Sequence, residues 1–119
     1  MNTLNLGEWP IFPASHQRFD KWQALKVLEE ASEVVEAAKE CLDYNLESFD
    51  EDEYEALEYN LADEIADLLQ AVVNLCDAYD ISENDIKTAR ARCIEINRLR
   101  GMFEPGPRTH MHREEDADD

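Results

Sequence analysis

Apolar residues recur every three or four positions along most of this chain, which is the repeat of an amphipathic α-helix. The pattern predicts helices over about 15–42, 51–79 and 83–100, and it leaves open a break near the start of the first. The face of the first helix that is expected to be buried consists of Leu28, Ala31, Val35, Ala38 and Leu42, widened on one side by Val27, Val34 and Cys41. The corresponding face of the second helix consists of Leu61, Ile65, Leu68, Leu69, Val72 and Cys76.

Polar residues mark the ends of these helices. Asp50 is expected to cap the second helix, with Glu53 as the other half of a capping box. Ser82 opens the third helix and Gly101 ends it. No strand pattern or internal repeat appears, so the sequence predicts an all-α fold, an antiparallel helical bundle. Because three helices bury little surface, we expect a homodimer, or a tetramer built from dimers, to complete a larger bundle.

The two ends of the chain lack a helical repeat. Residues 1–14 contain prolines among apolar residues, and Trp9, Ile11 and Phe12 need a surface on which to pack. This arm is expected to lie across the bundle or across a partner subunit. Residues 104–119 form an acidic segment that is expected to be a mobile tail. The remainder, 1–103, is predicted to be one domain that includes the arm.

The charge of the chain is strongly negative, with 11 basic and 29 acidic residues and a net charge of −18. Nucleic acids and anionic membranes bind basic surfaces, so neither is an expected partner. The sequence shows no apolar run of membrane-spanning length and no signal peptide, which predicts a cytoplasmic protein. Three widely spaced cysteines, Cys41, Cys76 and Cys93, are typical of reduced core thiols rather than of a disulfide framework.

Two acidic pairs with the same spacing stand out within this charge. Glu30 and Glu33 lie in the first helix, and Glu64 and Asp67 lie in the second. Residues three apart share one face of a helix, where like charges repel. Four carboxylates on two facing helices would suit Mg²⁺, or alternatively Mn²⁺. The other explanation is an ordinary solvated acidic surface. Farther along the second helix, Asn74 lies on the flank of the acidic pair, whereas Asp63, Gln70 and Asp77 are expected to point away from the core.

The segment EEASE at 29–33, followed by EIAD at 64–67, resembles the paired motifs of the MazG-like all-α nucleoside triphosphate pyrophosphohydrolases. The resemblance covers about residues 20–101. It implies that Glu30, Glu33, Glu64 and Asp67 bind Mg²⁺, and that an activated water cleaves the α–β phosphate bond of a nucleoside triphosphate. The products would be a nucleoside monophosphate and pyrophosphate. Glu33 is the candidate for the general base that takes the proton of this water.

Several other residues are candidates for binding the substrate, each with a structural alternative. Lys26 could reach a phosphate or could pair with Glu29 or Glu30. Trp22 or Phe19 could stack on a base or pack in the core, and His16 could meet a base edge or remain at the surface. Arg100 could bind phosphate or simply favour a helix C-terminus. The substrate-binding set that we predict is Trp22, Lys26, Asn74, Asn97 and Arg100.

Two competing functions remain open. The runs EEASEVVEAAKE and ADLLQAVVNL also resemble phosphoribosyl-ATP pyrophosphohydrolase of histidine biosynthesis. Against that enzyme stand the aromatic, proline-containing arm and the INRLRG ending of the third helix. From a different class, the chain could be a helical adaptor without catalytic activity, in which case the acidic pairs would bind no metal.

Overall fold

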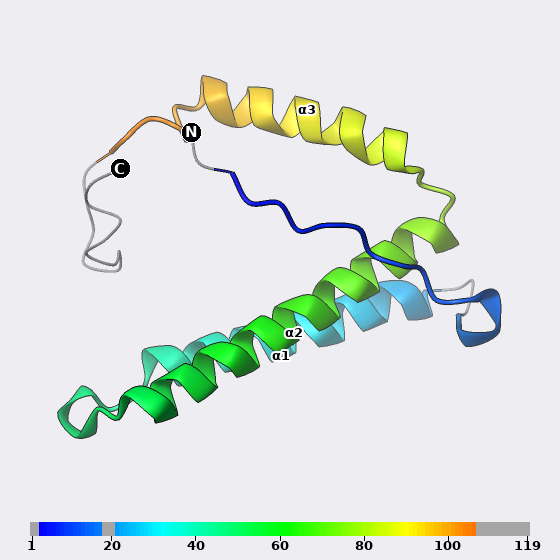
Figure 1. Cartoon of the computed structure of the whole chain (residues 1–119). Helices are drawn as coiled ribbons and strands as arrows, with labels where there is room; N and C mark the ends of the chain where they lie inside the picture. The colour runs from blue at the N-terminus through cyan, green and yellow to red at the C-terminus, as the bar shows by residue number, and fades with distance from the viewer. Residues whose placement is uncertain (1–2, 18–20, 107–119) are drawn as a thin grey trace. The chain divides into compact units, whose positions relative to one another are not determined.

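The computed structural model describes residues 3–17 and 21–106, and these residues form helices and connecting segments without any strand. Three α-helices, α1 (Trp22–Leu42), α2 (Glu51–Ala78) and α3 (Glu83–Leu99), are accompanied by single 3-10 turns at Ala14–His16 and Leu46–Ser48 (Figure 1). The predicted all-α class and the bounds of the second and third helices are confirmed. The first helix begins later than about 15, because Gln17 takes an extended conformation directly after the first 3-10 turn.

Contacts within the chain define two units. One is Leu6–Ser82, which contains most of the arm, α1 and α2; the other is Met1–Asn5 together with Glu83–Asp119, which contains α3. The predicted three-helix bundle and its completion by a second subunit stay predictions.

Helices α1 and α2 lie side by side and run in opposite directions (Figure 1). The residues of these two helices with the least exposed surface are small or amide side chains, Gln23 and Ala37 on α1 and Ala71 and Asn74 on α2. Alanine at the contact lets two helices approach closely, so the longer side chains beside it are brought together across the interface. This close approach positions the acidic residues described below.

Most of the stripe of α1 that was expected to be buried is instead exposed, and only Ala31 of this stripe is half-buried. Leu28, Val35 and Leu42 keep 66%, 58% and 65% of their surface exposed, whereas Val34 and Cys41, predicted to widen the stripe, are half-buried on the side of Ala37. Helix α1 therefore has apolar residues on two sides, and α2 packs on the narrower one. Helical periodicity locates both sides but does not tell which of them a neighbouring helix will cover.

The N-terminal arm lies across α2, as expected. The backbone N–H of Phe12 donates to Asn74 Oδ1 over 3.1 Å, and Gln70 Nε2 donates to the carbonyl of Pro10 over 2.7 Å. Gln17 adds a hydrogen bond from its Nε2 to the carbonyl of Phe12. Gln70 was predicted to point away from the core, and this was wrong, because the arm covers the side of α2 on which Gln70 lies.

The connection between α1 and α2 is held by Asp50 and Tyr44. Asp50 Oδ1 accepts from the N–H groups of Asp52 and Glu53 over 2.9 and 3.3 Å, which confirms the predicted cap. The other half of the capping box differs, because Tyr44 takes its place. The Tyr44 hydroxyl accepts from the Asp50 N–H over 3.0 Å and donates to Glu53 Oε2 over 2.7 Å. The rings of Tyr44, Phe49 and Tyr54 pack together beside it.

Helix α3 ends as the sequence predicts. Gly101 has a φ of 73°, a conformation that side chains disfavour. The Met102 N–H donates to the Asn97 carbonyl over 3.0 Å, which satisfies a carbonyl of the last turn.

The cysteines agree only in part with the sequence-based expectation. All three are free thiols, and Cys41 and Cys76 are half-buried, but Cys93 is exposed rather than in a core. Among the described helices, none has the length and apolar character needed to cross a membrane. Most of the predicted mobile tail, 107–119, lies outside the described residues. Phe19, a candidate for stacking on a base, also lies outside them.

We predict that Asp50→Ala lowers the free energy of unfolding by about 1 kcal/mol, because two N–H groups of the first turn of α2 lose their acceptor. Urea denaturation measures this loss. Asp52→Ala is the matched control, since it removes an acidic residue from the same turn but keeps the cap. Equal losses in the two variants would show that Asp50 acts only through its charge.

Candidate metal centre and adjoining cavity

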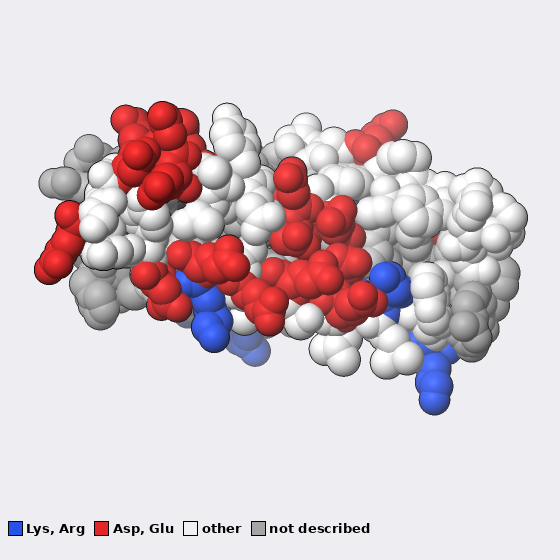
Figure 2. Space-filling model, turned by 90° about the horizontal axis from the view of Figure 1, so that it is seen from below, with Lys and Arg blue, Asp and Glu red and all other residues white. Residues whose placement is uncertain are grey.

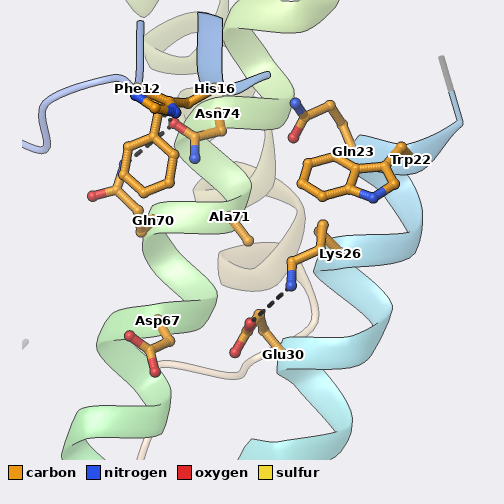
Figure 3. Close-up of a pocket in the computed structure, with 10 residues that line it drawn as sticks. All are labelled: Phe12, His16, Trp22, Gln23, Lys26, Glu30, Asp67, Gln70, Ala71 and Asn74. Carbon is orange, nitrogen blue, oxygen red and sulfur yellow. Dashed lines mark hydrogen bonds and ion pairs between the residues drawn. The ribbon is translucent and has the colours of Figure 1, made fainter. Parts of the chain in front are cut away.

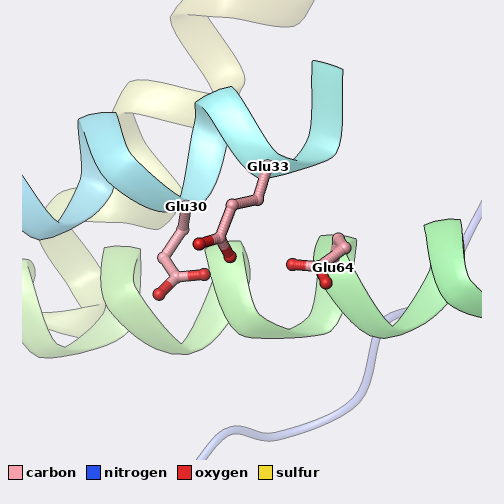
Figure 4. Close-up of side chains that lie close together, drawn as sticks. All are labelled: Glu30, Glu33 and Glu64. Atoms are coloured by element: carbon pink, nitrogen blue, oxygen red, sulfur yellow. The ribbon is translucent and has the colours of Figure 1, made fainter. Parts of the chain in front are cut away.

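Three carboxyl groups converge where α1 and α2 face each other. Glu30 and Glu33 are one helical turn apart on α1, and Glu64 faces them from α2 (Figure 4). One oxygen from each side chain lies within 4.8 Å of the corresponding oxygens of the other two. The structure thus brings together three of the four predicted metal ligands, from two segments that are about thirty residues apart in the sequence.

The crowding of these groups changes their proton affinity. Burial raises the pKa of Glu30, and the negative charge of Glu33 raises it further. The pKa of Glu33 is raised above all by a hydrogen bond with the Glu64 carboxyl, which favours a protonated form. Without a cation, therefore, this cluster retains protons that isolated glutamates would release.

Two oxygens of the cluster have no hydrogen-bond partner. Glu30 Oε2 and Glu64 Oε2 are both buried, yet neither meets a donor. A buried carboxylate oxygen without a partner costs free energy, so native proteins usually provide a donor or a cation. Carboxylate oxygens are hard ligands that Mg²⁺ and Mn²⁺ prefer. The donor set and the unpaired oxygens therefore fit a divalent cation.

Asp67, the fourth predicted ligand, lies close to Glu30 but outside the group of three. It faces Glu30 from α2 across the adjoining cavity, and its charge contributes to the raised pKa of Glu30. Its role as a ligand stays a prediction. Figure 2 shows a face of the molecule on which many Asp and Glu residues and few Lys or Arg residues lie.

A cavity of about 290 Å³ opens beside the carboxylate cluster (Figure 3). It lies between the first half of α1, the second half of α2 and the arm, so all three elements contribute to its wall. Its lining residues are Phe12, His16, Trp22, Gln23, Lys26, Glu30, Asp67, Gln70, Ala71 and Asn74. Glu30 belongs to both the cluster and the cavity, which makes the two continuous. Three of the predicted substrate-binding residues, Trp22, Lys26 and Asn74, are among those that line it.

Lys26 pairs with acidic residues of its own helix. Its Nζ lies 3.0 Å from Glu29 Oε2 and 3.7 Å from Glu30 Oε1. These neighbours raise the pKa of Lys26, chiefly through the hydrogen bond to Glu29. The ammonium group also lies 5.7 Å from the centroid of the Trp22 ring. Lys26 thus pairs with Glu29 and Glu30, which was the alternative to phosphate binding. It also lines the cavity.

The sequence-based reasoning missed four residues of the cavity wall, Phe12, Gln23, Gln70 and Ala71. Gln23 and Gln70 were not selected because glutamine on a helix usually faces solvent, and Phe12 was selected only as part of an apolar arm. A signal existed for Gln23, which lies seven residues before Glu30 and therefore on the same side of α1. No signal existed for Gln70, because its place in the cavity wall depends on the path of the arm.

The remaining candidates differ in position. His16 lines the cavity but is exposed, so both of its proposed roles remain open. Asn97 and Arg100 belong to the unit that contains α3, where Asn97 Nδ2 donates to Cys93 Sγ over 3.5 Å and Arg100 is exposed. Their predicted contact with substrate stays a prediction.

The raised pKa values predict a pH dependence of stability in the absence of metal. Because the native state keeps protons on Glu30 and Glu33 that the unfolded chain releases above about pH 4.3, stability should fall as the pH rises through the raised values. Urea denaturation between pH 4.5 and about 7, with a chelator present, measures this slope. Glu33→Gln should flatten it, whereas Glu55→Gln, which removes the same charge from an exposed site, should not. If stability depended on pH equally in Glu33→Gln and Glu55→Gln, the raised pKa values of the cluster would not be the cause of the pH dependence.

Comparison of the chain with models of known protein families, with curated proteins and with solved structures finds no match.

Proposed function

We propose that this protein is a Mg²⁺-dependent nucleoside triphosphate pyrophosphohydrolase of the MazG-like type, with Mn²⁺ as an alternative metal. The observation that supports this most is the convergence of Glu30, Glu33 and Glu64 with two buried, unpaired carboxylate oxygens. The cluster opens directly into a cavity that has both aromatic and amide side chains. A metal centre joined to such a cavity suits a substrate with a charged chain and a flat ring.

The carboxylates have two tasks in this proposal. Glu30 and Glu64 would hold the cation, since their unpaired oxygens are buried at the contact between the helices. The cation would neutralise the triphosphate and lower the pKa of a bound water. Glu33 is the proposed general base, because it lies beside Glu30 and Glu64 in the cluster and a carboxylate oxygen that does not bind the cation could accept the proton of the attacking water.

Lys26 would bind phosphate by exchanging partners. In the absence of substrate its ammonium group is held by Glu29 and Glu30 at the edge of the cavity. Both pairs are partly exposed, so little free energy is lost when they separate. A cation on Glu30 would compete with Lys26 for this carboxylate and leave the ammonium group for a phosphate oxygen.

We also propose that a second copy of the chain completes the bundle. The exposed stripe of Leu28, Val35 and Leu42 lies on a side of α1 that α2 does not cover. Residues seven apart share one helix face, and a continuous apolar face of this kind packs against another helix. A homodimer, or a tetramer built from dimers, would cover it.

We predict that the protein releases pyrophosphate, and not phosphate, from at least one nucleoside triphosphate in the presence of Mg²⁺. A panel of canonical and modified triphosphates, together with phosphoribosyl-ATP, separates this function from the histidine-biosynthesis alternative. Glu64→Gln should weaken Mg²⁺ binding and reduce hydrolysis by more than about a hundredfold, since loss of an outer partner alone costs about 10- to 100-fold. It should also raise the stability of the metal-free protein, because it removes repulsion with Glu33.

Glu55→Gln is the matched control, because Glu55 is exposed on the same helix. It should leave Mg²⁺ binding, measured by calorimetry, and hydrolysis unchanged. A loss of several kcal/mol in metal-free stability with normal hydrolysis in Glu64→Gln would instead identify Glu64 as part of a structural network. An adaptor would show no saturable Mg²⁺ binding that depends on Glu64.

We predict that sedimentation equilibrium shows a dimer or a larger assembly at micromolar concentration. Val35→Glu should shift the protein toward the monomer, because it places a charge in the middle of the exposed stripe. A monomer that persists for the wild-type chain as its concentration is raised would contradict the proposed dimer.

A further inference from the structure

The orientation of the Asn74 amide is fixed by its neighbours. Asn74 is buried, with 6% of its surface exposed. Its Oδ1 accepts from the Phe12 N–H over 3.1 Å and from Gln70 Nε2 over 3.3 Å. A backbone N–H can only donate, so the oxygen of the amide must face the arm. The Nδ2 group, with its two donors, is then turned toward the cavity between the helices (Figure 3).

The groups that contact Asn74 Oδ1 are themselves held in place. Gln70 also donates from Nε2 to the carbonyl of Pro10 over 2.7 Å, so its own position is held by the arm. Gln17 Nε2 donates to the carbonyl of Phe12, and Gln23 Nε2 donates to Gln17 Oε1 over 3.3 Å. The arm and the two helices therefore hold Asn74 as a donor, and reversing its amide would place NH₂ against the Phe12 N–H.

The shape of the cavity indicates the kind of group that would meet this donor. Phe12 and Trp22 both line the cavity, Phe12 on the side of α2 and Trp22 on the side of α1, and the volume of about 290 Å³ is near the lower end for small-molecule pockets. Flat heterocycles stack on such rings. The opposite end of the cavity is formed by Glu30 and Asp67, so a ligand with its ring near Asn74 has its charged end near the carboxylates.

We propose that Asn74 is a base-recognition residue, which donates from Nδ2 to a hydrogen-bond acceptor on the edge of a nucleobase that stacks on Trp22. The inference rests on the proposed function in so far as the base belongs to a nucleoside triphosphate. A carbonyl oxygen or an unprotonated ring nitrogen can accept this hydrogen bond, so every natural base has a suitable group. A ring without an acceptor would leave the buried Nδ2 without a partner, which weakens binding.

Titration of the metal-free full-length chain with nucleosides tests the inference without hydrolysis. The ligands are uridine, cytidine, adenosine and guanosine, and a nucleoside analogue with a phenyl ring in place of the base. At least one natural nucleoside should bind, and the phenyl analogue should bind about tenfold more weakly, as expected for one lost hydrogen bond. Asn74→Asp should weaken the natural nucleoside about tenfold and leave the phenyl analogue unchanged, because it replaces a donor by an acceptor of the same shape.

Asn60→Asp is the matched control, with the same change of charge at an exposed position of α2. It should not alter nucleoside binding. Equal weakening of both ligands by Asn74→Asp would show a structural role and overturn the inference, as would unchanged binding or no nucleoside binding by the wild-type chain. If Asn74→Asp does not fold, the wild-type chain still tests the inference, because equal binding of the natural nucleosides and the phenyl analogue would overturn it. Nucleoside binding without pyrophosphate release would refute the proposed function alone, and hydrolysis without this base preference would refute the role of Asn74 alone.

Discussion

Close packing of α1 on α2 through Ala37 and Ala71 places like charges together in a protein that already has a large excess of acidic residues. Each carboxylate in the cluster of Glu30, Glu33 and Glu64 repels the others, and two of their oxygens are cut off from water without a donor. Folding must supply the free energy for this arrangement from the burial of apolar surface elsewhere. Proton uptake relieves part of the cost, as the raised pKa values of Glu30 and Glu33 show, and a divalent cation would relieve more of it.

The contact between α1 and α2 also buries two polar side chains, Gln23 and Asn74. In a simple two-helix contact, Gln23 and Asn74 would be poor choices for the most buried positions. Here the arm and its neighbouring amides supply hydrogen-bond partners, so the cost of burying these side chains is offset. The interface is therefore divided along its length. Small apolar residues bring the helices together, carboxylates gather in the middle, and amides surround the cavity toward the start of α1.

The helical repeat predicted the fold class and the bounds of α2 and α3, because long amphipathic segments with polar caps are a strong local signal. Spacing on a helix also predicted that Glu30 and Glu33 share one face of α1, whereas their meeting with Glu64 was expected from the resemblance of the paired motifs. The buried side of α1 was not predictable, because Leu28 and Val34 lie on different faces and both are apolar. The contact of Gln70 with the arm and the place of Tyr44 in the capping box depend on segments outside the two helices, and no local pattern predicts such contacts.

The hairpin of α1 and α2 is held at both ends: Tyr44 and Asp50 lock the connection, and the arm ties Asn74 and Gln70 near the other end. Sliding one helix past the other by a single residue would move its side chains by about 1.5 Å. The carboxylate cluster lies between these two fixed points and so has little freedom to widen. A rigid group of oxygens selects an ion by size, because Mg²⁺ needs bonds of about 2.1 Å whereas Ca²⁺ needs bonds of about 2.3–2.6 Å. The hydrogen bonds at the two ends of the hairpin, which do not contact the ion, would thus determine which of two ions of equal charge is bound.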